Sequence, residues 1–488
     1  MSVFGTIAKQ SATYGVATAV ERGASILLLP VYTRYLSPAD YGVLELLATT
    51  ITITQLLVGL RLQEALFYFY SKAGDEESRQ RAVTTTLGGA LLLSIVIALA
   101  AVFASEPLSE LVFQTPDYGG MFTLALAGLA LNLPAEAGFA YLRAIDAARR
   151  FTVMTTFRLA VSAGVAVSTL VFWNFGVWAL LWGNFAGAAA TAAYMAGLIL
   201  FRMKPRFDLR LFLAQAAFSA PISLAGIGML FLHYGDRYFL QRSVTLAAIG
   251  VYALAYKIGM IVSFVHGPFV RHWTAQMYGI VERPDGDEVY VRVMTYLMFV
   301  LTLTAVALSL FSRPILTIMA PPEYHGAAAF VPWLGLAYVV RGFGDQVKSV
   351  FNIHRRTGYH LPVAAGAVAA VGVAYATLIP RFGVPGAVAS TVIGFAVFAA
   401  LAYSFAQRVH RYRFETWRLV KILATAAFVV ALFRLAEPAD FLTQVLLGWA
   451  GLATWFLLLA AVRFFRRNEL DALRSAAHAV QERIPLRR

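Results

Sequence analysis

The stretch RYLSPADYG at residues 34–42 is a short polar turn between two long apolar segments, and this arrangement decides the fold. The apolar segments cover residues 11–33 and 41–70. A helix needs about 20 apolar residues to cross the hydrocarbon of a bilayer. Both segments are long enough, so the sequence predicts two membrane-spanning helices joined by a tight turn.

Four ionisable residues lie within this predicted hairpin. Glu21 and Arg22 stand near the middle of the first helix, and Arg61 and Glu64 stand in the second. An ionisable group in hydrocarbon costs roughly 2.5 to 3.5 kcal/mol on insertion scales, so such groups face protein or water. We therefore expect the hairpin to form one wall of a polar cavity inside a helical bundle.

The composition extends this interpretation to the whole chain. Of the 488 residues, 59% are hydrophobic and 14% are charged, whereas soluble domains carry about 25% charged residues. Long apolar segments predict helices, because barrel strands are short and alternate. The chain has no cysteine, which excludes disulfides and thiolate chemistry. Basic cytoplasmic loops account for the net charge of +14, and we expect no nucleic-acid partner.

The hydropathy pattern predicts an all-α polytopic membrane protein with about 14 transmembrane helices. Loops are short, and the longest predicted one covers residues 271–292. The predicted spans are residues 11–33, 41–70, 82–104, 119–142, 152–173, 176–201, 211–233, 245–270, 291–311, 326–347, 361–380, 384–406, 418–436 and 441–465.

The lysines and arginines predict how the chain is oriented. With the N-terminus placed inside, nearly all of them fall in inner segments. The basic residues left outside are Arg34, Arg237, Arg242, Arg313, Arg381 and Arg434. Because cytoplasmic loops are enriched in lysine and arginine, we expect a multi-pass protein of the cytoplasmic (inner) membrane with both termini in the cytoplasm.

Three short patterns recur in the two halves of the chain at offsets of 206 to 208 residues. They are DYGVL and AIGVY at residues 40–44 and 248–252, the Arg-Arg pairs at 149–150 and 355–356, and FGV at 175–177 and 382–384. Three matches at one spacing predict a duplication of six spans. Because six is even, both copies enter the membrane from the same side, which predicts parallel repeats with a site between them.

This duplication predicts the domain organisation. Residues 1–206 form an N-terminal lobe with spans 1–6, and residues 207–407 form a C-terminal lobe with spans 7–12. Residues 408–465 add two further spans. Residues 466–488 form a basic cytoplasmic tail, for which an interfacial helix and a solvated segment both remain open.

Further ionisable residues within the predicted spans extend the candidate site. Lys257 lies near the middle of the eighth span, and Arg158 lies in the fifth. Arg341 and Asp345 are four residues apart in the tenth. The surplus of cations suits a phosphate or diphosphate, which arginine binds with two hydrogen bonds and lysine binds as a point charge.

We therefore predict a set of cavity residues that bind the diphosphate and sugars of a substrate, and a set of acids that act as charge partners or couple to Na+ or H+. The substrate-binding residues are Arg22, Arg61, Lys257, Arg341 and Arg158. The acids are Glu21, Glu64 and Asp345. No other cofactor and no metal site is expected.

Structural alternatives remain open for several of these residues. Residues three or four apart on a helix touch each other, so Arg61–Glu64 and Arg341–Asp345 could be self-neutralising pairs. Arg158 and Arg237 could extend to the membrane interface along their aliphatic stems.

Catalytic motifs are absent from the sequence. No Gly-rich nucleotide loop is present, which excludes a built-in ATP motor, and no His-Glu-x-x-His pattern occurs. The histidines are scattered, mostly near span ends or in loops. We expect a transporter rather than an enzyme, with no catalytic residues.

The chain resembles the oligosaccharide flippase or polysaccharide transporter family, to which O-antigen flippases belong. The resemblance covers nearly the whole chain. It is carried by LPVYTRYLSPADYG at residues 29–42, by GVYALAYK at 250–257, and by an arginine-rich loop followed by FGV in each half. This family is part of the multidrug/oligosaccharidyl-lipid/polysaccharide exporter superfamily, which also holds lipid II flippases and multidrug-and-toxin extrusion antiporters.

The resemblance implies a two-lobed bundle that alternates access to a cationic central cavity. Such a protein moves an undecaprenyl-diphosphate-linked oligosaccharide from the inner to the outer leaflet, for O-antigen, capsule or exopolysaccharide. In similar proteins, central cations of the first, second and eighth spans are implicated, which here are Arg22, Arg61 and Lys257. A polysaccharide polymerase and chain-length proteins are the partners that the resemblance implies.

Two alternative functions remain. A sodium- or proton-coupled drug or metabolite antiporter of the same superfamily has cationic substrates and therefore favours acids, so the surplus of arginine and lysine argues against it. A membrane glycosyltransferase or polymerase needs acidic residues on a sizeable outer loop. The short loops and the internal repeat argue against that class.

Overall fold

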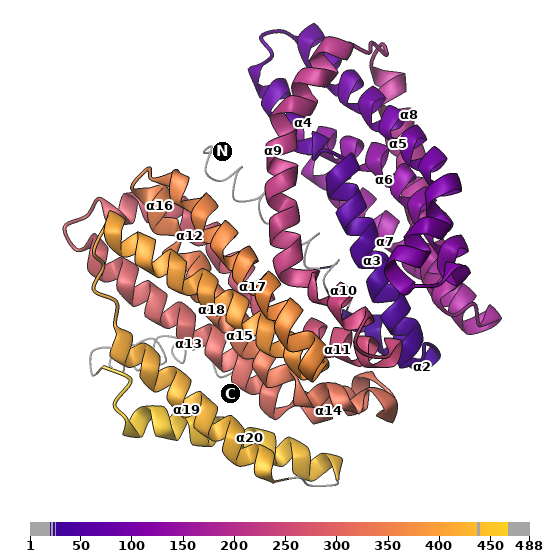
Figure 1. Ribbon diagram of the computed structural model, residues 1–488. Helices are drawn as coiled ribbons and strands as arrows, with labels where there is room; N and C mark the ends of the chain where they lie inside the picture. Colours follow the sequence, from indigo (N-terminus) through magenta and orange to yellow (C-terminus); the bar gives the residue numbers. More distant parts are fainter. Residues whose placement is uncertain (1–19, 21–22, 25, 437–439, 467–488) are drawn as a thin grey trace, which may run out of the picture. The chain divides into compact units, whose positions relative to one another are not determined.

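The computed structural model describes residues 20, 23–24, 26–436 and 440–466 of the chain. These residues form α-helices and short 3-10 helices, and no strand occurs among them. The predicted all-α class is therefore confirmed. Figure 1 shows the helices in chain order, from indigo to yellow.

Membrane-spanning helices make up most of the described part of the chain. There, 11 helices are long and apolar enough to cross a membrane, and a twelfth span results if η2 (Pro322–Ala329) and the helical segment Val331–Ile353, bent by 47°, count as one. The total of about 14 is not confirmed. About half of the predicted span 11–33 lies outside the described residues. The helix α19 (Thr416–Leu435) is described but is not among the 11.

The chain divides into two compact units, and the described residues of the first lie within Met1–Ala253, Met319–Tyr324 and Val371–Ala387. In this unit α5 packs against α6, α6 against α8, and α7 against α8. Its helices are α2 (Leu29–Tyr35), α3 (Pro38–Val58), α4 (Leu62–Lys72), α5 (Glu76–Phe113), α6 (Gly119–Ala144), α7 (Ala148–Trp173), α8 (Val177–Arg202), α9 (Leu209–Tyr234) and α10 (Asp236–Gln241).

The described residues of the second unit lie within Leu254–Ile318, His325–Ala370 and Val388–Arg488. Here α13 contacts α12, α15, α19 and α20. The helices are α12 (Ile261–Val281), α13 (Gly286–Leu310), α14 (Ser312–Met319), α15 (Val331–Val347), α16 (Ser349–Ile353), α19 and α20 (Phe441–Ala461). The chain passes between the units within α11 (Leu246–Gly259), α14, η2, α17 (His360–Phe382) and α18 (Val384–Val409).

Local sequence signals explain where the first hairpin turns. The predicted turn is confirmed, because α2 ends at Tyr35 and α3 begins at Pro38. Ser37 and Asp40 form a reciprocal capping box: the Ser37 hydroxyl accepts from the Asp40 N–H at 3.1 Å, and the Asp40 carboxylate accepts from the Ser37 N–H at 3.0 Å. Pro38 lies in the first helical turn, where its missing N–H costs nothing.

Glycines of two repeated patterns occupy special backbone positions. Gly176 and Gly383 of the repeated FGV have positive φ angles of 55° and 58°, which glycine adopts without strain. Gly42 and Gly250, from the first pattern, lie where α3 and α11 cross within the first unit. A Cβ atom on Gly250 would stand 1.9 Å from the carbonyl oxygen of Pro38. These matches agree with the duplication, whereas the lobe boundaries stay a prediction.

One predicted loop is wrong. The sequence predicts a loop over residues 271–292, but α12 and α13 fill most of it and only residues 282–285 separate them. Likewise, α5 extends well beyond the predicted span 82–104. Hydropathy marks the part of a helix that lies in hydrocarbon, whereas the helix itself continues into the polar zone until a capping or turn signal ends it.

Candidate functional site

The predicted site residues differ in how far the structure describes them. Glu21 and Arg22 lie outside the described part of the chain, and Lys257 is half-buried in α11. The other five form three groups, which are Arg61 with Glu64, Arg158, and Arg341 with Asp345.

Arg61 and Glu64 lie at a break between α3 and α4. Leu60 and Arg61 have positive φ angles of 48° and 43°, so the break occurs at two non-glycine residues in a sparsely populated conformation. Both charged side chains are half-buried, and neither forms an ion pair within the described part of the chain. Arg61 instead lies against α9, where a Cβ atom on Gly226 would stand 3.6 Å from its Nε. The pair that the spacing permits is not formed.

Arg341 and Asp345 do form the pair that the spacing permits, and Lys348 joins them. Asp345 lies 3.4 Å from the Arg341 Nε and 3.1 Å from the Lys348 Nζ. The Arg341 guanidinium also lies over the ring of Phe395 at 5.6 Å, and the Lys348 ammonium over that of Phe398 at 5.4 Å. Two cations share one carboxylate, so this group in the second unit keeps one positive charge.

Arg158 lies in a polar cavity of about 350 Å³ among α4, α6, α7 and α8 of the first unit. Its Nη1 is 3.4 Å from the Oε1 of Glu136 on α6, and the two side chains are 30% and 33% exposed. Arg143, also in the lining, donates a hydrogen bond of 3.2 Å to the Oε1 of Gln63 and lies over the ring of Phe151 at 5.7 Å.

The lining of this cavity offers the groups that bind a sugar. It combines two guanidinium groups and one carboxylate with amides, hydroxyls and aromatic rings, and one net positive charge remains. Amides and guanidinium groups hydrogen-bond to hydroxyls, and aromatic faces pack against sugar rings. The further polar and aromatic lining residues are Thr155, Ser162, Asn184 and Phe139. This chemistry suits a hydrophilic ligand that is neutral or anionic.

A second ionic cluster in the first unit is closed. The side chain of Arg237 is 0% exposed and lies 2.6 Å from Asp236 and 3.2 Å from Glu45 of α3. Its guanidinium lies over the rings of Tyr234 and Tyr252 at 4.9 and 5.3 Å, and the Tyr252 hydroxyl donates to Asp236. The interpretation that Arg237 extends to the membrane interface is wrong, because acids on α3 and α10 hold it in the interior.

Two acids that complete these clusters are not singled out by the sequence analysis. Glu136 lies in the predicted span 119–142, and Glu45 lies in 41–70. The rule that an ionisable residue within a span marks a site would have found both. Gln63 and Asn184 carry no charge and give no comparable signal.

The fold resembles those of two solved membrane proteins. The structure superposes on the lipid II flippase MurJ, in an inward closed conformation, with a TM-score of 0.74 and 12% identity, covering 92% of this chain and 99% of that one. For an inward-facing multidrug resistance MATE transporter of the MOP superfamily, the TM-score is 0.62 at 15% identity, covering 80% of this chain and 94% of that one. The chain therefore shares its fold with these two proteins.

The sequence comparisons identify the family. The model of the family described as "Polysaccharide biosynthesis protein" matches residues 7–272, more than half of the chain, and the chain belongs to this family. It is also 20% identical, over 239 residues, to the succinoglycan biosynthesis transport protein ExoT of Rhizobium meliloti (strain 1021). That match covers 49% of this chain and 47% of ExoT, so the chain spans about half the length of the curated relative that it matches.

The fold and the family together confirm the resemblance that the sequence predicted. The protein is a multi-pass membrane protein of this polysaccharide biosynthesis family, and the relatives that it resembles in sequence and in fold are named as transporters or flippases.

Proposed function

We propose that this protein is a flippase that moves undecaprenyl-diphosphate-linked oligosaccharide repeat units from the cytoplasmic to the outer leaflet by alternating access. The product serves a surface polysaccharide such as O-antigen or exopolysaccharide. The observation that carries this proposal is the polar cavity around Arg158, which lies among helices long and apolar enough to span a membrane. Membership of a polysaccharide biosynthesis family supports a glycan cargo.

In this proposal the cavity binds sugar residues while the lipid tail stays in the bilayer. Arg158 and Arg143 donate to sugar oxygens, and Glu136 accepts from sugar hydroxyls while it holds Arg158 in place. Phe151 packs against a ring face. Each of these contacts is modest, and a carrier needs modest contacts because it must release its cargo on the other side.

The diphosphate of the substrate is proposed to bind cations outside this cavity. Arg61 is well suited, because its guanidinium has no ion-pair partner in the described residues and lies at a break in a span. Arg22, and Lys257 of the second unit, stay candidates for binding an anion by resemblance alone. In the second unit, Arg341 belongs to a triplet that keeps one positive charge and could by itself attract an anion.

We propose Na+ or H+ as the coupling ion and Glu64 as the acid that binds it. Glu64 is half-buried and has no ion-pair partner within the described part of the chain. Asp345 is less suited, because Arg341 and Lys348 already neutralise it. Glu21 remains a candidate by sequence alone.

A complementation assay tests this function. In a strain that lacks the protein, surface polysaccharide and the lipid-diphosphate-linked repeat units held inside the cell are both measured. Wild-type protein, Arg158→Gln and Arg149→Gln are compared at equal membrane levels; Arg149 is exposed at the start of the same helix. We expect deletion to remove the polymer and trap the precursor, and Arg149→Gln but not Arg158→Gln to restore export.

Two outcomes contradict the proposal in different ways. Full rescue by Arg158→Gln shows that the site is misassigned even where the function holds. Unchanged polymer and precursor after deletion, with raised sensitivity to cationic drugs, replaces the flippase by the antiporter.

A further inference from the structure

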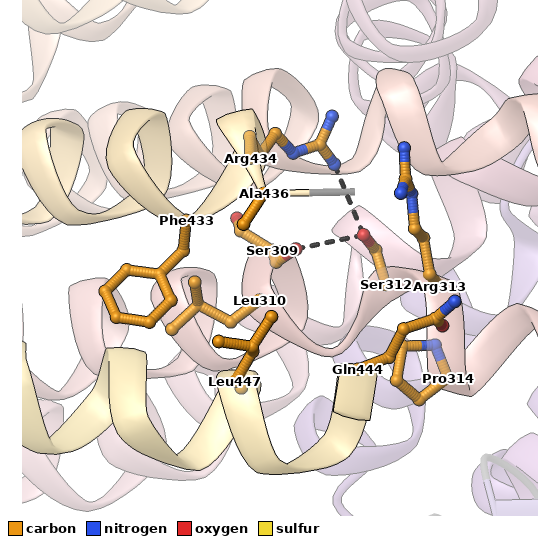
Figure 2. Close-up of a pocket in the computed structure, with 11 residues that line it drawn as sticks. Ser309, Leu310, Ser312, Arg313, Pro314, Phe433, Arg434, Ala436, Gln444 and Leu447 are labelled. Carbon is orange, nitrogen blue, oxygen red and sulfur yellow. Dashed lines mark hydrogen bonds between the residues drawn. The ribbon is translucent and has the colours of Figure 1, made fainter. Parts of the chain in front are cut away.

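Polar groups in the second unit differ in whether they have hydrogen-bond partners. Where the ends of α13, α14 and α19 meet, the Arg434 Nη2 donates to the Ser312 hydroxyl at 3.2 Å, and this hydroxyl donates to the carbonyl oxygen of Ser309 at 2.9 Å (Figure 2). His266 of α12 is different, because its Nε2 is buried and forms no hydrogen bond within the described part of the chain. Buried polar atoms without a partner are rare in folded proteins, so this imidazole needs an explanation.

The charges that act on His266 come from the end of α15. The helix α12 packs against α15, and the imidazole interacts electrostatically with Asp345, Arg341 and Lys348. These are the residues of the triplet described above, in which two cations share one carboxylate. Imidazole changes its charge between about pH 5 and pH 8. With neutral His266 the group has one net positive charge, and protonation of His266 adds a second.

Other charged groups near α12 are exposed or have partners of their own. On α13, Asp287 lies 2.7 Å from the Nε2 of His410, and the remaining charged side chains of that helix are exposed: Glu288 and Arg292. The short helix α16 has no ionisable side chain. One further histidine, His360, interacts electrostatically with Lys348, but its Nε2 lies within hydrogen-bond distance of Asn352, at 2.9 Å.

The cations of the triplet keep hydrogen-bond donors for a ligand. Asp345 lies 3.4 Å from the Arg341 Nε, and the guanidinium forms no hydrogen bond within the described residues. The Lys348 ammonium donates only one of its three protons, to Asp345 at 3.1 Å. The rings of Phe395 and Phe398 lie beside these cations at 5.6 and 5.4 Å and help to orient them. The two basic side chains are 24% and 29% exposed, so a solute can reach them.

The basic residues of the chain predict on which side of the membrane this group lies. The predicted spans 245–270 and 326–347 are the eighth and the tenth, so with the N-terminus inside both run from the outer to the inner side. His266, Arg341 and Asp345 all stand toward the inner ends of these spans. A ligand that enters from the cytoplasm therefore reaches the group near the inner surface.

We propose that Arg341 and Lys348 bind an oxyanion, and that protonation of His266 strengthens this binding. Guanidinium and ammonium groups bind phosphate oxygens with charge-assisted hydrogen bonds. A protonated imidazole adds a cation near the ligand and competes with both residues for the carboxylate of Asp345. Because linkage is reciprocal, the anion in turn draws a proton onto His266. The anion is the diphosphate of the cargo, a step that rests on the proposed function, and a proton then accompanies the cargo.

Isothermal titration calorimetry of the purified full-length protein with inorganic sulfate, at pH 5.5 and pH 8, tests this proposal. Sulfate offers the oxygens of a phosphate but keeps its charge over this range. Binding that persists in Arg341→Gln belongs to other sites and is subtracted. We expect the remaining affinity to be roughly tenfold higher at pH 5.5. His266→Gln cannot take up a proton and should keep the weaker affinity at both pH values.

Two histidine variants are the controls. His272→Gln changes an exposed residue of the same helix, and His360→Gln changes the other histidine that interacts with Lys348. Both should keep the difference between the two pH values. Thermal unfolding checks that each variant is folded. Loss of the difference in His360→Gln would place the proton at that residue and overturn the assignment to His266.

The wild-type protein alone can also overturn the proposal, because equal sulfate affinity at the two pH values excludes the linkage. A pH dependence that persists in folded His266→Gln contradicts it as well. The source of the anion is tested by comparing a short-chain isoprenyl diphosphate with inorganic diphosphate at pH 8. We expect the isoprenyl compound to bind more tightly, and equal binding would overturn the step that assigns the cargo's diphosphate to this site. The complementation assay tests the flippase itself, so the two proposals can fail separately.

Discussion

Two arginine–carboxylate groups in the first unit share their chemistry but differ in their surroundings. Arg237 is completely buried, with acids at 2.6 and 3.2 Å and tyrosine rings beside its guanidinium. Arg158 is 30% exposed, has Glu136 at 3.4 Å, and faces a cavity of about 350 Å³. Breaking a buried pair leaves an uncompensated charge and costs several kcal/mol, whereas an exposed pair contributes about 0 to 1 kcal/mol.

This difference separates structural from binding charges. The bonds around Arg237 hold α3 and α10 together and leave little hydrogen-bonding capacity for a ligand. The groups around Arg158 are loosely paired and open to a cavity, so their remaining capacity is available to a hydrophilic cargo. The presence of a charged residue within a span therefore does not indicate its role. Its burial and its ion-pair partners do indicate whether it is structural or binds a ligand.

Removal of the buried guanidinium should have the largest effect on stability. Arg237→Met leaves Glu45 and Asp236 without their shared cation, and we expect the free energy of unfolding to fall by roughly 3 to 5 kcal/mol. Thermal unfolding of the purified protein measures this, with the exposed Arg242→Met as control. If Arg237→Met and the control unfold at the same midpoint, Arg237 does not stabilise the fold, which contradicts its assignment as a structural charge.

Loss of the carboxylate shared by Arg341 and Lys348 in the second unit should lower the free energy of unfolding by an intermediate amount. Asp345→Asn leaves Arg341 and Lys348 without the carboxylate that they share, and we expect a loss of roughly 1 to 3 kcal/mol. The side chains are only partly exposed, so solvent does not fully screen the cations. The exposed Glu288→Gln serves as control in the same unfolding assay. A stabilised Asp345→Asn would show that desolvation of the carboxylate outweighs its pairing.

The open pair should contribute little to stability. Arg158→Gln and Glu136→Gln are each expected to change the free energy of unfolding by less than about 1 kcal/mol, because both side chains are about one third exposed. The double variant should equal the sum of the single ones within that range. A loss as large as that of Arg237→Met would place Arg158 among the structural charges.

The smallest expected effect is a pH dependence at the end of the second unit, outside the spans. His354 stacks on His410 at 4.8 Å, and the His410 Nε2 lies 2.7 Å from Asp287. Burial, and then the charge of His410, lower the pKa of His354, against a smaller opposing effect of Asp287. In the unfolded chain His354 has a pKa of about 6.5, so it binds a proton more readily there than in the folded protein.

His354 therefore stabilises the folded protein above about pH 6.5. This contribution is lost as the pH falls through the pKa that His354 has in the folded protein, which is the lower of the two. We expect the unfolding midpoint to drop modestly between pH 7.5 and pH 5.5, and His354→Gln to reduce this drop. Greater stability at the acidic pH in the wild-type protein would reverse the sign and contradict this account.

Local sequence signals predicted the features that depend on one segment. The turn at residues 34–42 and most spans follow from hydropathy and capping residues. The positive φ angles of Gly176 and Gly383 were not predicted, and they explain the glycine of the repeated FGV. The pairing of charges across helices could not be predicted. Glu136 and Arg158 meet because α6 and α7 rotate their polar faces toward one cavity, and that rotation depends on the packing of the whole unit.

The same limit explains why the sequence left the position of Arg237 open. From the sequence it stands near the end of a span, where a long side chain commonly reaches the interface. Its partner Glu45 is almost two hundred residues away in the chain. Glu45 and Arg237 meet only because α3 packs close to α10 in the folded protein. The ends of the helices could not be predicted either, because hydropathy does not indicate how far α12 continues beyond the hydrocarbon.

The most direct test of the central claim is a translocation assay in reconstituted vesicles that contain a lipid-diphosphate-linked oligosaccharide. The accessibility of the glycan to an external lectin is followed for the wild-type protein and Arg158→Gln at equal reconstituted amounts, and the folded state of each is checked by thermal unfolding. We predict translocation by the wild-type protein and loss of most of its rate in Arg158→Gln at nearly unchanged stability. Equal rates for the two proteins would contradict the claim that the open charge pair, and not the closed one, handles the cargo.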